Sequence, residues 1–167
     1  MSNYSNVRSK IRSGDLLAFS HQGWKTFKDI KSQIVRMATR SEFSHVAIAW
    51  VVGDRVFCIE AVIPEVRIYP LSKNGNFYWI PTNPPWKPET EEMALSFVGY
   101  KYSQWDAIKA FFRPLAKGNV SECAALVLNI MQQDGVDLGT RATPDSVVLQ
   151  AQLYGHPVYF VENKLGK

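Results

Sequence analysis

The sequence contains few cysteines, no long apolar run and no block of charge of one sign. Only two of its 167 residues are cysteine, too few for the disulfide framework of a small secreted domain. No apolar stretch approaches the roughly 20 residues that a membrane-spanning helix needs. The formal charge of +4 is spread along the chain, without the basic cluster of a nucleic-acid-binding protein. We therefore expect no nucleic-acid partner, no transmembrane segment and two free thiols.

Residues 1–15 are polar and basic, and they lack the apolar centre of a secretory signal. This favours a cytoplasmic location. Hydrophobic residues make up 46% of the chain and charged residues 20%, as in an ordinary folded protein. The length suits one domain spanning 1–167.

Strand signals dominate the front half of the chain and helix signals the back half, with a proline-rich connection at 81–88 between them. Apolar and β-branched runs predict strands at 16–19, 44–52, 56–62, 66–69, 77–80 and 158–161, with Gly53-Asp54 as a hairpin turn. Apolar spacing and start signals predict helices at 26–39, from Pro88 to before Gly99, at 104–112, from Ser121 and from Thr143 to about Leu153. The pattern indicates an α+β domain.

Cys123 falls in the first turn of the helix that Ser121 can cap. Unpaired backbone N–H groups and the helix dipole favour an anion there, which lowers a thiol pKa and increases the nucleophilic thiolate. Its own N–H can face an oxyanion. The alternative is a buried cysteine that only packs.

His45 alternates with Ala47 and Ala49 along a predicted strand. Two alanines beside a histidine leave room for a helix on that face, and a helix with Cys123 at its tip would bring the thiol to the imidazole. The alternative is a core histidine with satisfied hydrogen bonds.

Glu60 is the only charged residue in the run 56–62, and a charge is seldom buried without a partner. If the hairpin sets this strand beside that of His45, the carboxylate can accept the imidazole N–H and orient the ring. The alternative is an edge-strand glutamate facing water. Cys58 shares the face of Glu60, so we expect it to lie deeper and to pack.

Four short motifs in a fixed order resemble those of the permuted papain-like hydrolases, relatives of the NlpC-type cell-wall amidases, and most of all the YiiX-like branch. They are Gly14-Asp15-Leu16-Leu17, Ser44-His45-Val46-Ala47-Ile48, Glu60-Ala61 and Glu122-Cys123-Ala124-Ala125-Leu126-Val127. In the unpermuted family the Cys helix comes first, whereas here it comes last. Thr143-Pro144-Asp145 also resembles a feature of the branch. The resemblance implies a curved antiparallel sheet or small barrel packed against helices.

The resemblance implies that Cys123 is the nucleophile, His45 the base and Glu60 the residue that orients it, with no cofactor and no metal. Tyr102 lies in a Gly-x-x-Tyr element that has Ser103 where the family usually has Asp. Tyr102 is therefore a candidate for lining the site or donating to the oxyanion, with a simple packing role as the alternative.

The expected function is hydrolysis of an amide through an acyl-enzyme, with a peptide or cell-wall peptide as substrate. One alternative is a lipid esterase or acyltransferase of the lecithin–retinol acyltransferase type, acting on a lipid ester or amide. Another is an inactive binding module on the same fold. Zinc is a weaker alternative, because one Cys and one His fall short of the usual four structural ligands.

Overall fold

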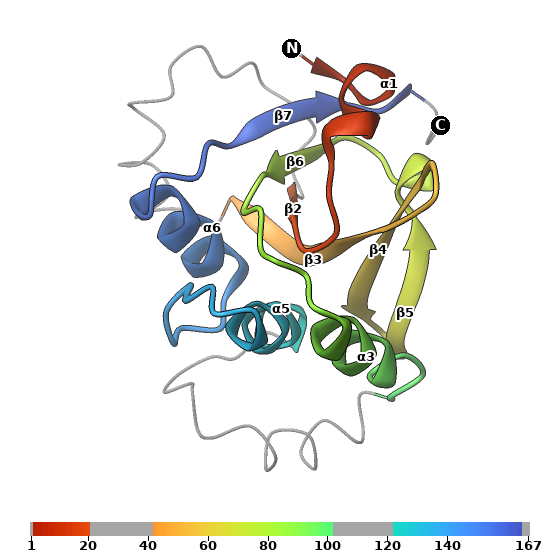
Figure 1. Ribbon diagram of the computed structural model, residues 1–167. Helices are drawn as coiled ribbons and strands as arrows, with labels where there is room; N and C mark the ends of the chain where they lie inside the picture. Colours follow the sequence, from red (N-terminus) through yellow and green to blue (C-terminus); the bar gives the residue numbers. More distant parts are fainter. Residues whose placement is uncertain (1, 21–41, 102–121, 165–167) are drawn as a thin grey trace.

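A seven-stranded sheet organises the residues that the computed structural model describes, 2–20, 42–101 and 122–164 (Figure 1). The strand order is β1-β7-β6-β2-β3-β4-β5, in which six strands run antiparallel and β1 pairs parallel to β7. The strands are β1 Ser2–Asn3, β2 Leu16–Ser20, β3 Phe43–Val52, β4 Arg55–Val62, β5 Glu65–Pro70, β6 Phe77–Ile80 and β7 Tyr159–Glu162. All six strands predicted from the sequence are thereby confirmed, with β1 added, and the α+β class and curved antiparallel sheet agree with expectation.

The β3–β4 hairpin turns at Gly53-Asp54, as the sequence predicts. Val52 pairs with Arg55 across a two-residue turn in which Gly53 has a φ of 59°. A glycine adopts this left-handed conformation without the clash that a Cβ would bring. The tight turn fixes the register of β3 against β4, and hence the relative positions of the side chains on both strands.

The helices have the boundaries α1 Tyr4–Val7, α3 Pro88–Ser96, α5 Glu122–Gln133 and α6 Pro144–Leu153, and 3-10 turns lie at Arg8–Lys10 (η1) and Leu71–Lys73 (η2). Thr143 caps α6 through a reciprocal capping box with Ser146. The N-terminal turns were not predicted, and the predicted helices at 26–39 and 104–112, with Ser121, lie outside the described residues. Within the described segments, no helix is long and apolar enough to cross a membrane.

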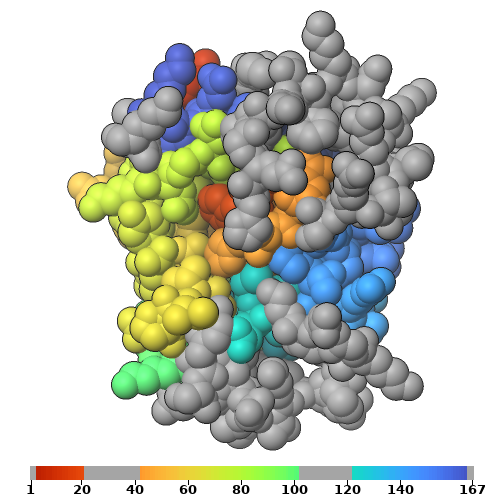
Figure 2. All heavy atoms as spheres, turned by 180° about the vertical axis from the view of Figure 1, so that it is seen from behind, coloured from red at the N-terminus to blue at the C-terminus, as the bar shows by residue number. Residues whose placement is uncertain are grey.

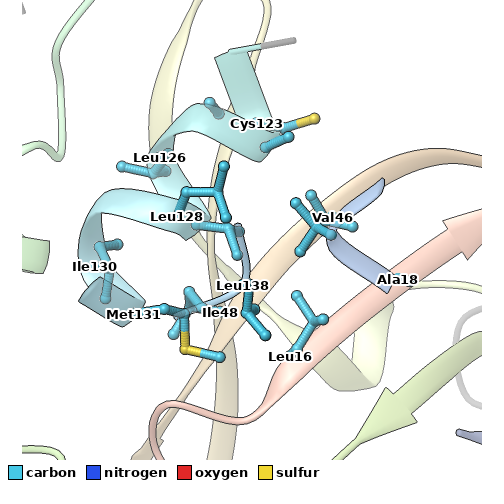
Figure 3. Close-up of a cluster of buried hydrophobic side chains, with 14 of the residues drawn as sticks. Leu16, Ala18, Val46, Ile48, Cys123, Leu126, Leu128, Ile130, Met131 and Leu138 are labelled. Atoms are coloured by element: carbon cyan, nitrogen blue, oxygen red, sulfur yellow. The ribbon is translucent and has the colours of Figure 1, made fainter. Parts of the chain in front are cut away.

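Two hydrophobic cores cover the two faces of the sheet. On one face, α3, α5 and α6 pack against a cluster that includes Val46 and Ile48 of β3, part of which is drawn in Figure 3. On the other face, Ala47 and Ala49 join a second cluster with residues of α1 and η2 and with Ile11. The expectation that α5 packs on the alanine face is therefore wrong. Both faces of this inner strand are buried, so its alternation alone could not indicate which face the helix covers.

The proline-rich connection at 81–88 is anchored by two buried carboxylates. Asp15, with 0% of its surface exposed, accepts a 2.8 Å hydrogen bond from the Trp79 indole and one from the backbone of the connection. Asp134 accepts from two backbone N–H groups of the connection and from the Thr90 hydroxyl at 2.6 Å. These bonds satisfy the backbone groups of an extended segment that makes no sheet ladder of its own.

β5 is the last strand in the sheet order, and its outer edge is covered by the turn after α3. The Val66 N–H donates to the Tyr100 carbonyl at 2.9 Å, and the Gly99 N–H donates to the Val66 carbonyl at 2.8 Å. Glu65 and Lys101 form an isolated antiparallel bridge beside them. The start of β5 is thus held by backbone bonds on both sides.

Candidate active site

His45 lies near the start of β3, directly after an irregularity in the sheet. Ser20 pairs with Phe43 and Phe19 with His45, so that Ser44 is an extra residue on β3. Such a bulge redirects the neighbouring side chain. The His45 ring contacts the Phe19 ring, with centroids 5.6 Å apart, and retains 20% exposure.

The start of β3 is held by Asp145 from the first turn of α6. One oxygen of this carboxylate, Oδ1, accepts from the N–H groups of Glu42 and Phe43, both at 2.9 Å. Thr143 and Pro144 begin α6 and so fix the position of Asp145. A helix that follows Cys123 in the chain therefore determines where the strand of His45 begins.

Cys123 occupies the first turn of α5, as predicted, and is 5% exposed. The apolar side of α5, including Leu126 and Ile130, packs into the first core and holds the helix against β3 and β4. Figure 3 shows Cys123 at one end of this cluster. In the space-filling view of Figure 2, atoms of β3 and of the start of α5 lie side by side on one face.

The Cys123 thiol forms a hydrogen bond with the imidazole of His45. The late helix and the early strand are thus in contact through the two side chains that the sequence singled out. The helix reaches His45 from the opposite face of β3 to the one predicted, and the catalytic roles of Cys123 and His45 stay predictions.

Glu60 lies on the far side of the His45 ring. Its Oε2 is 2.8 Å from His45 Nε2, and its side chain is only 3% exposed. Because β4 lies between β3 and β5, Glu60 is not an edge-strand residue facing water. Ala49 pairs with Cys58, so His45 and Glu60, further along the same two strands, come together on one face.

Arg67 completes the arrangement, and sequence reasoning missed it. It pairs with Glu60 across the β4–β5 ladder. Its Nε and Nη2 lie 2.9 Å and 2.8 Å from Glu60 Oε1, and its guanidinium stacks over the Tyr69 ring at 4.5 Å. The signal in the sequence was a pair of opposite charges, Glu60 and Arg67, on two consecutive predicted strands.

The contacts among Cys123, His45, Glu60 and Arg67 stabilise the charged forms of His45 and Glu60. Burial lowers the pKa of His45, but hydrogen bonds and charge interactions with Cys123 and Glu60 outweigh it and raise the pKa to about 9. Burial raises the pKa of Glu60, yet His45 and Arg67 together hold it below its ordinary value. The site therefore favours an imidazolium beside an ionised carboxylate.

The contact with Glu60 also orders the imidazole. An ionised carboxylate only accepts hydrogen bonds, so Nε2 carries a proton, and Nδ1 is the ring nitrogen left to interact with Cys123. In the neutral ring Nδ1 can accept the thiol proton, and in the imidazolium it donates to a thiolate. The ring is therefore oriented for proton exchange with Cys123.

Cys58, the second cysteine, is fully buried in the other core, where the Asn74 amide donates to its sulfur at 3.3 Å. Burial raises the pKa of this thiol well above its usual range, with a further increase from the charge of Glu60. These contacts agree with the packing role expected from the sequence.

Two other expectations concern Tyr102 and metal. Tyr102 lies outside the described residues. Among the residues that the structure describes, no group of three or more His, Cys, Asp and Glu side chains is arranged to hold a metal ion. Both carboxylate oxygens of Glu60 are already engaged, one by His45 and one by Arg67.

No protein-family model and no curated protein matches the chain. Among solved structures, the fold is similar to that of the metalloprotein yiiX from Escherichia coli O157:H7, with a TM-score of 0.44 and 17% sequence identity. The match covers 74% of this chain and 66% of that one, so the chain spans slightly less than two thirds of that protein's length. This is a distant likeness of fold, and what the site can do follows from its own residues.

Proposed function

We propose that the protein is a cysteine hydrolase that cleaves an amide bond, with Cys123 as nucleophile, His45 as acid and base, and Glu60 orienting the ring. The observation that carries the proposal is the row of contacts from the Cys123 thiol through the imidazole of His45 to the buried carboxylate of Glu60. A nucleophile, a base in contact with it and a third group behind the base are the parts of a catalytic triad. The proposal includes a permuted papain-like fold of the NlpC type.

The reactive form is a thiolate–imidazolium pair, in which the proton of Cys123 is already held by His45. The thiolate attacks the carbonyl carbon of the amide and forms a tetrahedral intermediate whose oxyanion the Cys123 N–H can stabilise. As the C–N bond breaks, the imidazolium gives its proton to the leaving amine. A water molecule then attacks the thioester and passes a proton to His45, so that the acid is released and the thiolate–imidazolium pair restored.

The raised pKa of His45 suits this cycle. With a pKa of about 9, the imidazole is protonated near neutral pH, as a general acid for a poor leaving group requires. The nitrogen of an amide leaves as an amine only when it is protonated. The phenolate of an activated ester can leave without a proton. Amides, including peptides and cell-wall peptides, are therefore the proposed substrate class, and the panels described below separate them from esters.

Alkylation by iodoacetamide at about pH 6, followed by peptide mapping, tests the nucleophile. An ordinary thiol with a pKa near 8.5 is only about 0.3% thiolate at this pH, so a thiolate–imidazolium pair is expected to react at least tenfold faster than glutathione. Cys58 is the internal control and should stay unlabelled, because it is fully buried. If Cys123 reacts no faster than glutathione, the proposed nucleophile is wrong.

Turnover is tested on two matched panels, dipeptide amides and p-nitrophenyl esters. Cleavage of the amides by the wild type, and not by Cys123→Ala, supports the proposal. Ester cleavage without any amide cleavage would point instead to the lipid acyl chemistry considered from the sequence. A hyper-reactive Cys123 with no turnover on either panel would favour a binding module on the same fold.

A further inference from the structure

The pairing of Arg67 with Glu60 is closer and more directional than an ordinary surface ion pair. Both Nε and Nη2 converge on one oxygen, Glu60 Oε1, at 2.9 Å and 2.8 Å. The other oxygen, Oε2, is left to His45. The guanidinium also stacks on the ring of Tyr69, which belongs to the same strand.

We propose that Arg67 is a positioning residue of the site, which fixes the Glu60 carboxylate so that one oxygen alone meets His45 Nε2. This inference rests on the proposed function. Arg67 touches neither the sulfur nor the scissile bond in this scheme, and it acts through Glu60.

Arg67 restrains the orientation of the Glu60 carboxylate. A carboxylate can turn about its terminal bond, and this torsion is broad and weakly restrained in glutamate. Two N–H groups on Oε1 remove that freedom and set the second oxygen on the imidazole. Without Arg67, the side chain would be held by the hydrogen bond to His45 alone, and the ring would lose part of its orientation.

Arg67 also compensates the charge of Glu60. Glu60 is 3% exposed, and a buried carboxylate stays ionised only if its charge is compensated. The groups facing it are His45 on β3, the Cys58 thiol on β4 and Arg67 on β5, with Cys123 on α5 beyond the imidazole. When Cys123 is a thiolate, Arg67 and the imidazolium balance the two negative charges of the row.

The opposing view is that an arginine with 45% exposure contributes little, as most surface ion pairs do. Here, however, only one partner reaches solvent. The carboxylate is buried and the start of β5 is held on both edges, so the pair resembles a half-buried bridge whose disruption leaves a charge without its compensation.

The experiment compares Arg67→Met, Arg67→Lys and Arg55→Met. Arg55 is exposed at the other end of β4, so Arg55→Met is a control that removes the same charge away from the site. For each variant, the rate of Cys123 alkylation is followed against pH, and the ¹³C shift of the Glu60 carboxyl is titrated. Circular dichroism confirms that each variant is folded, and Arg67→Lys is the second variant should Arg67→Met not fold.

Arg67→Met is expected to slow alkylation at about pH 6 by roughly tenfold, the typical effect of losing a charge-assisted hydrogen bond. It should also move the Glu60 titration to higher pH. Arg67→Lys, which keeps the charge and loses the fork, should fall between wild type and Arg67→Met, and Arg55→Met should match wild type.

The two proposals fail in different ways. An Arg67→Met variant whose Glu60 titration and alkylation profile both coincide with wild type would overturn the positioning role. An ordinary, unreactive Cys123 in the wild type would overturn the proposed function, while the Glu60 titration would still decide whether Arg67 governs that carboxylate.

Discussion

The substitution Glu60→Gln should shift the protonation of His45 by a measurable amount. The pKa of about 9, against an ordinary 6.5, corresponds to about 3 kcal/mol in favour of the imidazolium at 1.36 kcal/mol per pH unit. Glu60 and Cys123 supply this preference against the cost of burial. Glutamine keeps the size of the side chain and an acceptor oxygen but removes the negative charge. We therefore expect the His45 midpoint to fall by about one to two pH units.

The assay is a pH titration of the imidazole Cε1–H signal by NMR. The chain has three histidines, and the signal lost in His45→Gln identifies the one in the site. Cys123→Ala is the companion variant and should also lower the midpoint, because the thiol is the other hydrogen-bond partner. A wild-type midpoint near the ordinary value, or a midpoint unchanged by Glu60→Gln, would refute the electrostatic reasoning.

Three further predictions concern stability. The pKa of Glu60 is lower in the folded chain than its ordinary value, so the ionised carboxylate adds to the free energy of unfolding above pH 4.5, and this stabilisation is lost as the pH falls. In Glu60→Gln, the free energy of unfolding in urea should therefore depend less on pH on the acid side. Asp145→Ala should cost about 2 kcal/mol in the same assay, because two N–H groups at the start of β3 lose a charged acceptor, and an unchanged midpoint of unfolding would contradict this. Gly14→Ala should lower the melting temperature more than Gly53→Ala, although both glycines have a positive φ. A Cβ at Gly14 would lie 2.1 Å from Pro84 Cγ, whereas a Cβ at Gly53 would meet open space. Equal decreases in melting temperature would contradict the close contact at Gly14.

Much of the site could be predicted from the sequence because its parts lie in strongly patterned elements. A β-branched run with a two-residue turn specifies a hairpin and its register, and this brings His45 and Glu60 together. The position of Cys123 in the first turn of a helix could be predicted from the apolar spacing of the residues that follow it. The contact between Cys123 and His45 could be predicted only from the ordered set of motifs, because no local pattern fixes where a late helix packs on an early strand.

The parts that could not be predicted share a physical reason, since each depends on a partner distant in sequence. Val46 and Ala47 are both buried, on opposite faces of β3, so alternation could not choose the face that receives α5. Arg67 was not singled out, because its partner Glu60 is defined only by strand register. The N-terminal turns went unnoticed because Tyr4 and Val7 are sparse apolar residues in a polar stretch, and only the second core shows why they are buried.

The covered edge of β5 has a consequence for how copies of the protein meet. An open edge strand invites another chain to add a strand and start aggregation. Here the N–H and carbonyl of Val66 are already used by Gly99 and Tyr100, so an incoming strand would first have to displace that turn. Strand addition at the start of β5, next to Arg67, would therefore cost these two hydrogen bonds before any new ones form.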